Sequence, residues 1–216
     1  LFDKEERKII LIRDRIGIKP LFYCYINNMF MFASELKAFS VFKSDLSLNN
    51  DAIGEYLNYG FISSEQTIYK ECYRLPPATT LELNIDNIKD INITKYWNLQ
   101  NFANQDKINE KEIEIINDTS KKIEQSVKNQ MISDVPIGSF LSGGIDSSIV
   151  TSLMQKNSID KINTFSIGSK NNDYDESIDA KKIANFIGTN HTELIFDDNE
   201  MTNIIDRVIT AIKDPV

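Results

Sequence analysis

The 216-residue chain is 41% hydrophobic and 26% charged, a composition typical of a folded globular protein and not of a disordered one. Its 32 acidic side chains outnumber the 24 basic ones. The resulting net charge of −8 argues against nucleic acid as a partner, because an acidic surface repels phosphate. No stretch approaches the roughly 20 apolar residues of a membrane span, and the first residues lack the basic and apolar runs of a signal peptide, so we expect a cytoplasmic protein with no membrane partner.

The first hundred residues predict mostly β structure. Short runs rich in β-branched and aromatic residues are typical of strands, and Asn27-Asn28 between two of them predicts a tight hairpin turn because asparagine tolerates positive φ. We also expect a short helical turn over residues 34–39 and a helix over residues 50–59. The predicted strands are residues 8–13, 20–26, 29–33 and 79–85.

Two cysteines, Cys24 and Cys72, show neither the spacing of a metal site nor that of a redox motif. Because the sequence carries no export signal, we expect two buried or partly buried free thiols in a reducing cytoplasm, with a disulfide as the alternative.

The pattern changes after residue 100. Residues 98–112 are polar with few apolar anchors, so we expect a linker at 101–112 between a first domain, residues 1–100, and a second, residues 113–216. Isoleucine and valine then recur at helical spacing, which predicts an amphipathic helix over residues 111–130. The elements predicted after it are strands at 135–141, 161–168 and 191–196 and helices at 147–155, 176–187 (closed by Gly188) and 200–212. This alternation is typical of a parallel sheet with crossover helices.

One segment, Ser142-Gly143-Gly144-Ile145-Asp146-Ser147-Ser148, lies between a predicted strand and a predicted helix. Two adjacent glycines let the backbone approach an anion without a Cβ in the way. The helix that follows directs its free N–H groups and its positive dipole end to the same place. Serine hydroxyls add donors, so the segment predicts a phosphate cradle. The alternative is a plain turn in which Asp146 caps the helix.

Asp146 narrows the expected ligand. A carboxylate beside phosphate is repelled unless a cation lies between them, and Mg²⁺ bound to a nucleotide supplies that cation. We therefore expect a magnesium nucleotide, with Asp146 as the side chain associated with the metal. The segment has neither the Gly-x-x-x-x-Gly-Lys pattern of a Walker A loop nor the Gly-x-Gly-x-x-Gly pattern of a dinucleotide site.

In this setting the segment resembles the pyrophosphate loop of the N-type ATP pyrophosphatases, which adenylylate a carboxyl or similar oxygen and release pyrophosphate. Within these enzymes, the chain is similar to the glutamine-hydrolysing asparagine synthetases of the B type. The stretches similar to that family occur in the right order over nearly the whole chain. They are residues 13–21, 32–38, 67–69, 75–77, 96–97, 133–138, 165–168, 174–176 and 188–193.

The resemblance implies an α/β protein. In it, the mostly β remainder of an N-terminal-nucleophile glutaminase domain precedes a parallel-sheet α/β ATP-pyrophosphatase domain of the adenine nucleotide α-hydrolase-like type. It also implies a ligase that uses ATP, Mg²⁺ and ammonia from glutamine to convert aspartate to asparagine through β-aspartyl-AMP; a homodimer is left open. The residues carried over by position are Ser142, Gly143, Gly144, Asp146 and Ser147 for the pyrophosphate end of ATP and Leu141 and Ile167 for the adenosine.

The resemblance further implies that parts of the family's machinery lie outside the chain. The family's glutaminase nucleophile is an N-terminal cysteine, whereas this chain starts at Leu1, and neither Cys24 nor Cys72 offers a free α-amine. No catalytic residue is therefore assigned within the chain. The family's second loop, Ser-Gly-Glu-Gly-x-Asp-Glu, does not occur before Val216. We expect an internal fragment, truncated at both ends, that is inactive in both half-reactions by itself.

Other functions stay open. A relative with the same two domains and another acceptor, such as a β-lactam-forming or cell-surface-sugar-modifying amidotransferase, carries the same residues. A non-catalytic nucleotide-binding remnant is a second alternative. A tRNA-modifying ATP pyrophosphatase is disfavoured by the acidic charge and by the lack of a basic stripe.

Four further groups of residues are expected to have structural roles. His191, the only histidine, is expected to be structural at a strand start, with catalysis as the alternative. Asp175-Glu176 is expected to be a solvated helix start, since acids favour the first turn, with contact to the metal or substrate as the alternative. For Arg13-Asp14-Arg15 we expect a hairpin salt-bridge cluster, with an anion site as the alternative. Tyr96-Trp97 is expected to be an aromatic anchor at the domain junction.

Overall fold

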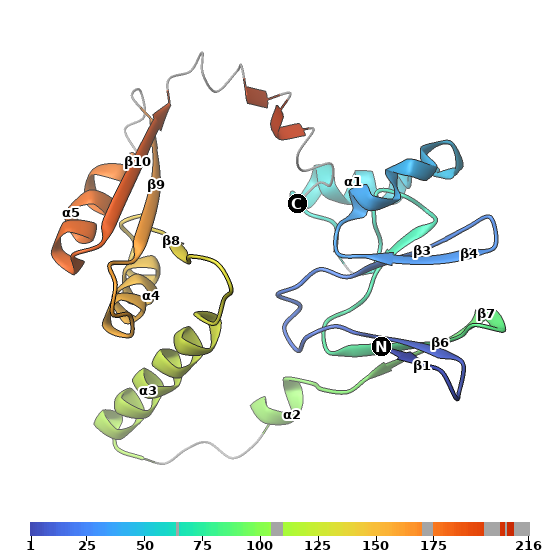
Figure 1. Cartoon of the computed structure of the whole chain (residues 1–216), viewed down its shortest axis with the longest axis horizontal. Helices are drawn as coiled ribbons and strands as arrows, with labels where there is room; N and C mark the ends of the chain where they lie inside the picture. Colours follow the sequence, from blue (N-terminus) through green and yellow to red (C-terminus); the bar gives the residue numbers. More distant parts are fainter. Residues whose placement is uncertain (64, 105–109, 170–174, 197–203, 206, 210–216) are drawn as a thin grey trace. The chain divides into compact units, whose positions relative to one another are not determined.

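The structure is a computed structural model that describes residues 1–63, 65–104, 110–169, 175–196, 204–205 and 207–209. These residues form a mixed α/β protein with three sheets, and the contacts divide them into two compact units. The first unit contains the described residues up to 104 together with residues 207–209, and the second contains those from 110 to 205. The first unit has two antiparallel sheets and the second a parallel one (Figure 1). None of the helices in the described part of the chain is long and apolar enough to cross a membrane.

The two sheets of the first unit have the strand orders β1-β2-β6-β7 and β4-β3-β5. The first sheet consists of β1 (Phe2–Asp3), β2 (Lys8–Ile12), β6 (Thr79–Asn84) and β7 (Asn87–Lys95). The second sheet consists of β3 (Phe22–Ile26), β4 (Met29–Ala33) and β5 (Cys72–Arg74). The four strands expected from the first hundred residues are confirmed as β2, β3, β4 and β6.

The local signals for turns and helices in this unit are confirmed as well. Asn27 and Asn28 have φ of 50° and 60° and join β3 to β4, as a two-residue hairpin turn with positive φ at both positions requires. Helix α1 (Asn50–Tyr59) is capped by the Asn49 side chain, which accepts the Ala52 N–H at 3.3 Å. The expected helical turn is a longer 3-10 segment, η1 (Leu36–Asp45).

Strands β1, β5 and β7 have no counterpart among the four predicted ranges, and β1 has only two residues. β5 has only three residues, too few for a period to show. β7 is mostly exposed, and its register against β6 shifts between Leu83 and Asn84, so its apolar residues do not alternate regularly along the strand. A bulge of this kind follows from strand pairing and is not encoded in the local pattern.

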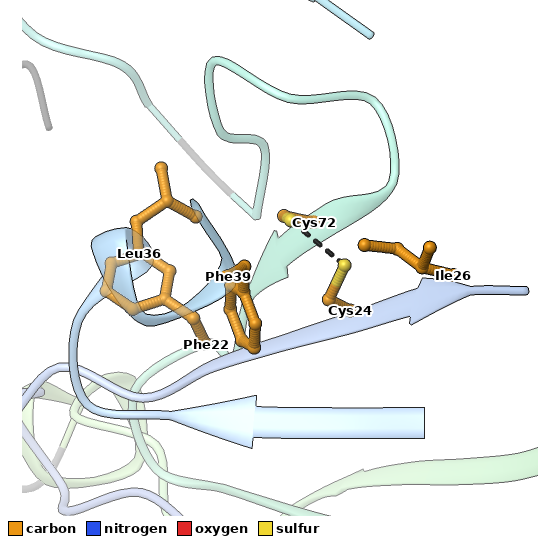
Figure 2. Packing of buried hydrophobic residues seen from close by; sticks show 6 residues of the cluster. All are labelled: Phe22, Cys24, Ile26, Leu36, Phe39 and Cys72. Carbon is orange, nitrogen blue, oxygen red and sulfur yellow. Dashed lines mark hydrogen bonds between the residues drawn. The ribbon is translucent and has the colours of Figure 1, made fainter. Parts of the chain in front are cut away.

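The core of the first unit lies on both faces of β3. Tyr23 packs with Leu11, Leu81 and other apolar side chains of the four-stranded sheet. The alternate residues of β3, including Cys24, pack on the other face with η1 and β5 (Figure 2). Because successive side chains of a strand point to opposite faces, a strand buried on both sides is apolar throughout, as β3 is.

The second unit has one parallel sheet in the order β10-β9-β8, which confirms the expected parallel arrangement. Its elements are α3 (Glu112–Gln130), β8 (Gly138–Phe140), α4 (Ile145–Lys156), β9 (Asn163–Ser169), α5 (Ser177–Ile187) and β10 (Asn190–Phe196). β8 is shorter than the expected strand at 135–141. Gly188 closes α5 with φ of 85°, as predicted.

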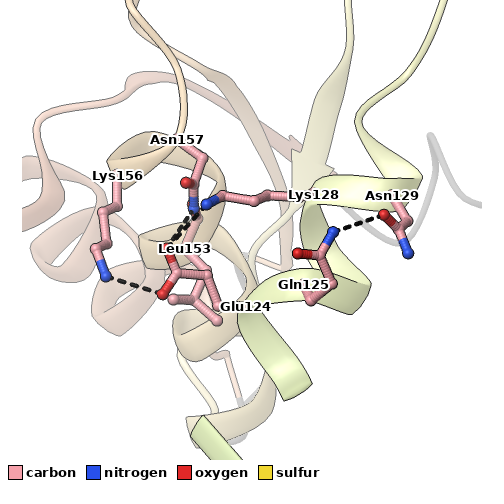
Figure 3. A network of polar contacts seen from close by, with 7 residues as sticks. All are labelled: Glu124, Gln125, Lys128, Asn129, Leu153, Lys156 and Asn157. Carbon is pink, nitrogen blue, oxygen red and sulfur yellow. Dashed lines mark hydrogen bonds and ion pairs between the residues drawn. The ribbon is translucent and has the colours of Figure 1, made fainter. Parts of the chain in front are cut away.

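Polar contacts tie α3 to α4. Glu124 Oε2 lies 3.0 Å from Lys156 Nζ, and its other oxygen accepts from the Asn157 amide at 3.3 Å (Figure 3). The segment expected as a linker contains a short helix, α2 (Gln100–Ala103), and its residues 105–109 lie outside the described residues. Most of the helix expected at 200–212 also lies outside them; residues 204, 205 and 207–209 are helical.

Candidate functional site

The segment from Ser142 to Ser148 follows β8 at the carboxyl edge of the parallel sheet. In open α/β sheets, ligands bind in the crevice outside this edge. The structure has a pocket of about 350 Å³ there. The residues that line it are Phe140, Leu141, Ser142, Ser147, Phe165, Ser166, Ile167, Glu176 and Ser177.

Gly143 is required in the loop for two reasons. Its φ is +81°, and this conformation is energetically unfavourable for any residue that has a Cβ atom. A Cβ built on it would lie 3.1 Å from Asp179 Cβ and 3.2 Å from the Ala180 backbone nitrogen, both in the first turn of α5. The loop therefore packs directly against the start of α5, which fixes the position of its main chain.

Gly144 is the N-cap of α4 and has no side chain that could accept the first-turn N–H groups. These donors and the positive end of the helix therefore stay directed at the loop. The serine hydroxyls behave differently from the expectation. Ser147 Oγ and Ser148 Oγ donate to the Gly144 carbonyl at 3.2 and 2.6 Å, and the Ser142 backbone N–H donates to Ser147 Oγ at 3.3 Å. The hydroxyls hold the loop in shape, and the backbone N–H groups of α4 are left as donors for an anion.

Asp146 lies exposed in the first turn of α4. The helix has Gly144 as its N-cap and no side-chain capping bond, so the alternative in which Asp146 caps the helix is wrong. Among the residues that the structure describes, no three acidic, histidine or cysteine side chains gather in a way that could hold a metal ion. A single carboxylate fits a cation that arrives on a nucleotide, because Mg²⁺ in such sites takes one or two carboxylates and phosphate oxygens.

The structure brings most of the expected ATP-binding residues together. Those that line the pocket are Leu141, Ser142, Ser147 and Ile167, while Gly143 and Gly144 form the loop between them and Asp146 lies outside the lining. The lining residues that the sequence analysis missed are Phe140, Phe165, Ser166 and Ser177, whereas Glu176 was named there with a ligand contact as the alternative. The alternating pattern of β9 was the available signal for Phe165 and Ser166, since its successive side chains reach opposite faces of the sheet at the same edge.

Asp175 and Glu176 have separate roles. Asp175 Oδ1 accepts the backbone N–H of Ser177 at 3.0 Å, a bond that lowers the pKa of the Asp175 carboxyl. This is the helix-start role expected for the pair. Glu176 is the N-cap of α5 and lines the pocket.

His191 is one hydrogen bond away from the pocket lining. Its Nδ1 lies 3.0 Å from Thr164 Oγ1 and its Nε2 lies 3.2 Å from Ser166 Oγ, so both ring nitrogens are bonded to hydroxyls of β9. Thr164 Oγ1 lies 2.8 Å from Thr189 Oγ1. The ring thus connects the buried Thr164 to Ser166, a lining residue.

The prediction of a salt-bridge cluster at Arg13-Asp14-Arg15 is wrong for Arg13 and Asp14. The Arg13 guanidinium donates to the carbonyls of Leu75, Gly17 and Lys19 at 2.5, 3.0 and 3.1 Å. The Asp14 carboxylate accepts four backbone N–H groups of residues 16–19, and these bonds lower its pKa to about 2. Both side chains bond to the main chain because the loop at 14–19 folds around them and leaves its own N–H and C=O groups without strand partners.

The two cysteines lie in the hydrophobic core of the first unit. Cys24 and Cys72 are 0% and 1% exposed and are direct partners on β3 and β5, with their sulfur atoms 3.0 Å apart. The bond that Cys72 donates to Cys24 raises the pKa of the Cys72 thiol, and burial raises it further. The expected pair of buried free thiols is confirmed, and neither is accessible to a substrate.

Two protein-family models match the chain. Residues 1–97 match the glutamine amidotransferase domain, and residues 118–216 match asparagine synthase. The first match covers the unit of antiparallel sheets, and the second begins within α3 and includes the loop and the parallel sheet.

Individual relatives agree along the whole chain. The protein named "Putative asparagine synthetase (glutamine-hydrolyzing) 2" of Methanocaldococcus jannaschii is 35% identical over 96% of this chain, which spans 40% of that protein. Asparagine synthetase (glutamine-hydrolyzing) 1 of Bacillus subtilis is 30% identical over 100% of this chain, which spans 33% of that protein. Amidase chyE of Penicillium rubens is 26% identical over 87% of this chain, which spans 29% of it. The chain thus spans well under half the length of these curated relatives.

Proposed function

The chain belongs to the glutamine-hydrolysing asparagine synthetases over the part that it covers, and from this premise we propose that the protein carrying it is a C–N bond-forming ligase that makes asparagine from aspartate. Glutamine supplies ammonia, and ATP activates the aspartate side chain. The carboxylate oxygen attacks the α-phosphorus of ATP, pyrophosphate leaves, and a β-aspartyl-AMP anhydride forms. Ammonia then attacks the acyl carbon, the C–O bond to AMP breaks, and asparagine forms with loss of a proton. Splitting one difficult displacement into two easier ones is the benefit of such an intermediate.

The observation that carries the proposal is the loop between β8 and α4. Its main chain is held by α5 through Gly143, and the N–H groups of the first turn of α4 are directed at it. A polyphosphate is the ligand that such a helix start favours. Leu141 and Ile167 line the adjoining pocket and supply an apolar surface for the adenosine, with Ser142, Gly144 and Ser147 near the phosphates.

Mg²⁺ is part of the proposal because of the local charge. The carboxylates of Asp146 and Glu176 lie in the loop and in the pocket lining, and both repel the phosphates of free ATP. Mg²⁺ on the phosphates removes this repulsion, and Asp146 is the side chain that we assign to the metal.

The domain assignment follows the two kinds of sheet. We place the closing part of a glutaminase of the N-terminal-nucleophile type at residues 1–100, a linker at 101–112, and the beginning of a synthetase domain of the adenine nucleotide α-hydrolase-like type at 113–216. Burial of Cys24 and Cys72 supports a glutaminase nucleophile outside this chain. Small molecules are the proposed partners, and sedimentation of the protein decides between a monomer and a homodimer.

The test compares Asp146→Asn with Asp160→Asn, an exposed aspartate of the same unit that does not line the pocket. Aspartate-dependent exchange between ATP and pyrophosphate is expected in the protein that carries the chain, to be lost with Asp146→Asn and kept with Asp160→Asn. Glutamine hydrolysis is expected to survive both changes, because the proposed sites are separate. Exchange that survives Asp146→Asn removes this residue from the site.

The nearest alternative is an enzyme of the same kind that acts on a carboxylic acid other than aspartate, and the similarity to amidase chyE is the reason to keep this alternative. The same exchange assay with a panel of carboxylic acids separates the two. Exchange with another acid and none with aspartate contradicts the asparagine assignment while keeping the ATP site.

A further inference from the structure

A second pocket, of about 680 Å³, lies within the first unit. This volume is within the range of small-molecule sites. The lining is largely apolar and includes Pro76, Pro77 and Ile93, and it also contains Arg15 and Trp97. The sequence analysis singled out both of these residues, and the proposed synthesis of asparagine uses neither.

The loop that carries Arg15 has a fixed main chain. Arg13 donates to three carbonyls there and in the neighbouring wall, and Asp14 accepts four N–H groups of the loop. Gly17 of the same loop packs so closely on the pocket wall that a Cβ built on it would lie 2.9 Å from Pro77 Cγ. The main chain from which the Arg15 side chain extends is therefore in place before any ligand arrives.

Tyr96 fastens another part of the lining to that loop. Its hydroxyl donates to the Arg13 carbonyl at 2.8 Å, and its backbone N–H donates to the Ala78 carbonyl at 2.9 Å. Lys95 and Trp97, the neighbours of Tyr96 in the chain, both line the pocket. A site whose frame is already ordered loses less conformational entropy when a ligand binds.

Three charged side chains line the pocket without a partner. In the part of the chain that the structure describes, Arg15, Lys95 and Glu65 form neither an ion pair nor a side-chain hydrogen bond. The two cations outnumber the carboxylate, so the lining is positive within a chain whose net charge is −8. This local excess attracts an anion. The planar guanidinium of Arg15 can bond both oxygens of a carboxylate at once.

Trp97 adds a surface for a ring. The indole is half-buried and stacks on Phe102, with ring centroids 5.7 Å apart. Aromatic rings pair favourably in offset-stacked and edge-to-face arrangements, beyond the gain from the apolar area that they bury. With Pro76 and Pro77 in the same lining, a ligand that carries a ring buries it against apolar side chains.

We propose that this pocket binds a small aromatic carboxylic acid, with its carboxylate on Arg15 and Lys95 and its ring against Trp97. Glu65 supplies an acceptor for an amino group on the same molecule, so an aromatic amino acid matches all three charges. The inference goes beyond the proposed function, because none of the residues that line this pocket lines the pocket beside the glycine loop.

Fluorescence of the full chain tests the proposal, because its only tryptophan, Trp97, lines the pocket. The probes are L-phenylalanine, 3-phenylpropionate, 2-phenylethylamine and inorganic phosphate. Both acids are expected to change the emission in a saturable way, with phenylalanine bound about threefold or more tightly through Glu65. Phenylethylamine, which has no carboxylate, and phosphate, which has no ring, are expected to bind about tenfold or more weakly than phenylalanine.

Two variants separate the charges. Arg15→Gln is expected to weaken both acids about tenfold, as the loss of a charge-assisted bond implies. Glu65→Gln is expected to remove the advantage of phenylalanine and to keep the binding of phenylpropionate. Neither replaced side chain has a partner among the described residues, so both variants are expected to fold. Lys89→Gln is the matched control, because Lys89 is an exposed lysine of β7, like Lys95, that does not line the pocket; it should leave both affinities unchanged.

The results that overturn the proposal are distinct from those that overturn the nucleotide site. They are the absence of a saturable change with either acid, phosphate binding as tight as that of phenylpropionate, and acid binding that Arg15→Gln leaves unchanged. A failure of ATP to bind the chain contradicts the proposed function and leaves this pocket unaffected, because the two pockets share no lining residue.

Discussion

Replacing Gly143 with alanine should destabilise the second unit more than the same change at Gly188. Both glycines have positive φ, +81° and +85°, and a left-handed backbone costs a residue with a Cβ roughly 1–2 kcal/mol. At Gly188 nothing lies within 4 Å of the added methyl group, so this cost stands alone. At Gly143 the methyl group meets Asp179 Cβ at 3.1 Å and the Ala180 nitrogen at 3.2 Å, and overpacking of this kind adds about 1–3 kcal/mol. The expected losses are therefore about 1–2 kcal/mol for Gly188→Ala and about 2–5 kcal/mol for Gly143→Ala.

Urea unfolding of the full chain measures these losses, with a separate signal for each unit. The only tryptophan, Trp97, lies in the first unit, so its fluorescence follows that unit and should be unchanged by both variants. Circular dichroism at helical wavelengths is dominated by α3, α4 and α5 and follows the second unit. Two transitions that separate in this way are expected for a chain of two compact units.

Nucleotide binding completes the comparison. Gly143→Ala displaces the main chain that presents the N–H groups of α4, so binding of Mg²⁺-ATP should be lost, whereas Gly188→Ala should keep it. Equal stability losses for the two variants would refute the close packing of the loop against α5. Full ATP binding by a folded Gly143→Ala protein would refute the role of the loop.

Three further predictions concern the first unit. Backbone N–H groups lower the pKa of Asp14 from 3.8 to about 2, so its carboxylate stabilises the folded chain above pH 4 and this stability is lost as the pH falls toward 2. In acid unfolding, Asp14→Asn should therefore make the free energy of unfolding depend less on pH in this range. Asp90→Asn, at an exposed strand position, should leave that dependence unchanged. Diamide added while the unfolded chain refolds, when it can still reach thiols that are buried in the folded protein, should join Cys24 to Cys72 and take up two electrons and two protons as the S–S bond forms. A thiol titration of the refolded protein that still counts two thiols contradicts this, since the bond requires no large backbone movement between residues that are paired across β3 and β5. Leu81→Ala should lower the stability of the first unit by about 2–5 kcal/mol, because Leu81 is 0% exposed; a loss under about 1 kcal/mol in tryptophan-detected unfolding would contradict its place in the core.

Local patterns in the sequence were sufficient for most elements. The asparagine pair at residues 27–28, the helical spacing after residue 111 and Gly188 each determine a conformation within a few residues, and each prediction is confirmed. The position of the glycine loop between a strand and a helix was also predicted from the sequence and is confirmed, while the anion site at the helix start stays a prediction.

The residues that line the pocket and the partners of their hydrogen bonds depended on the tertiary structure. Ser166, His191 and Thr189 come from separate parts of the sequence, and the register of β9 against β10 brings them together. In the same way, Asp14 was expected to pair with an arginine but bonds to main-chain N–H groups, because the loop folds around it. A residue's own conformation follows from neighbours in the chain. The partner of its polar atoms follows from strand register and packing, which the whole fold decides.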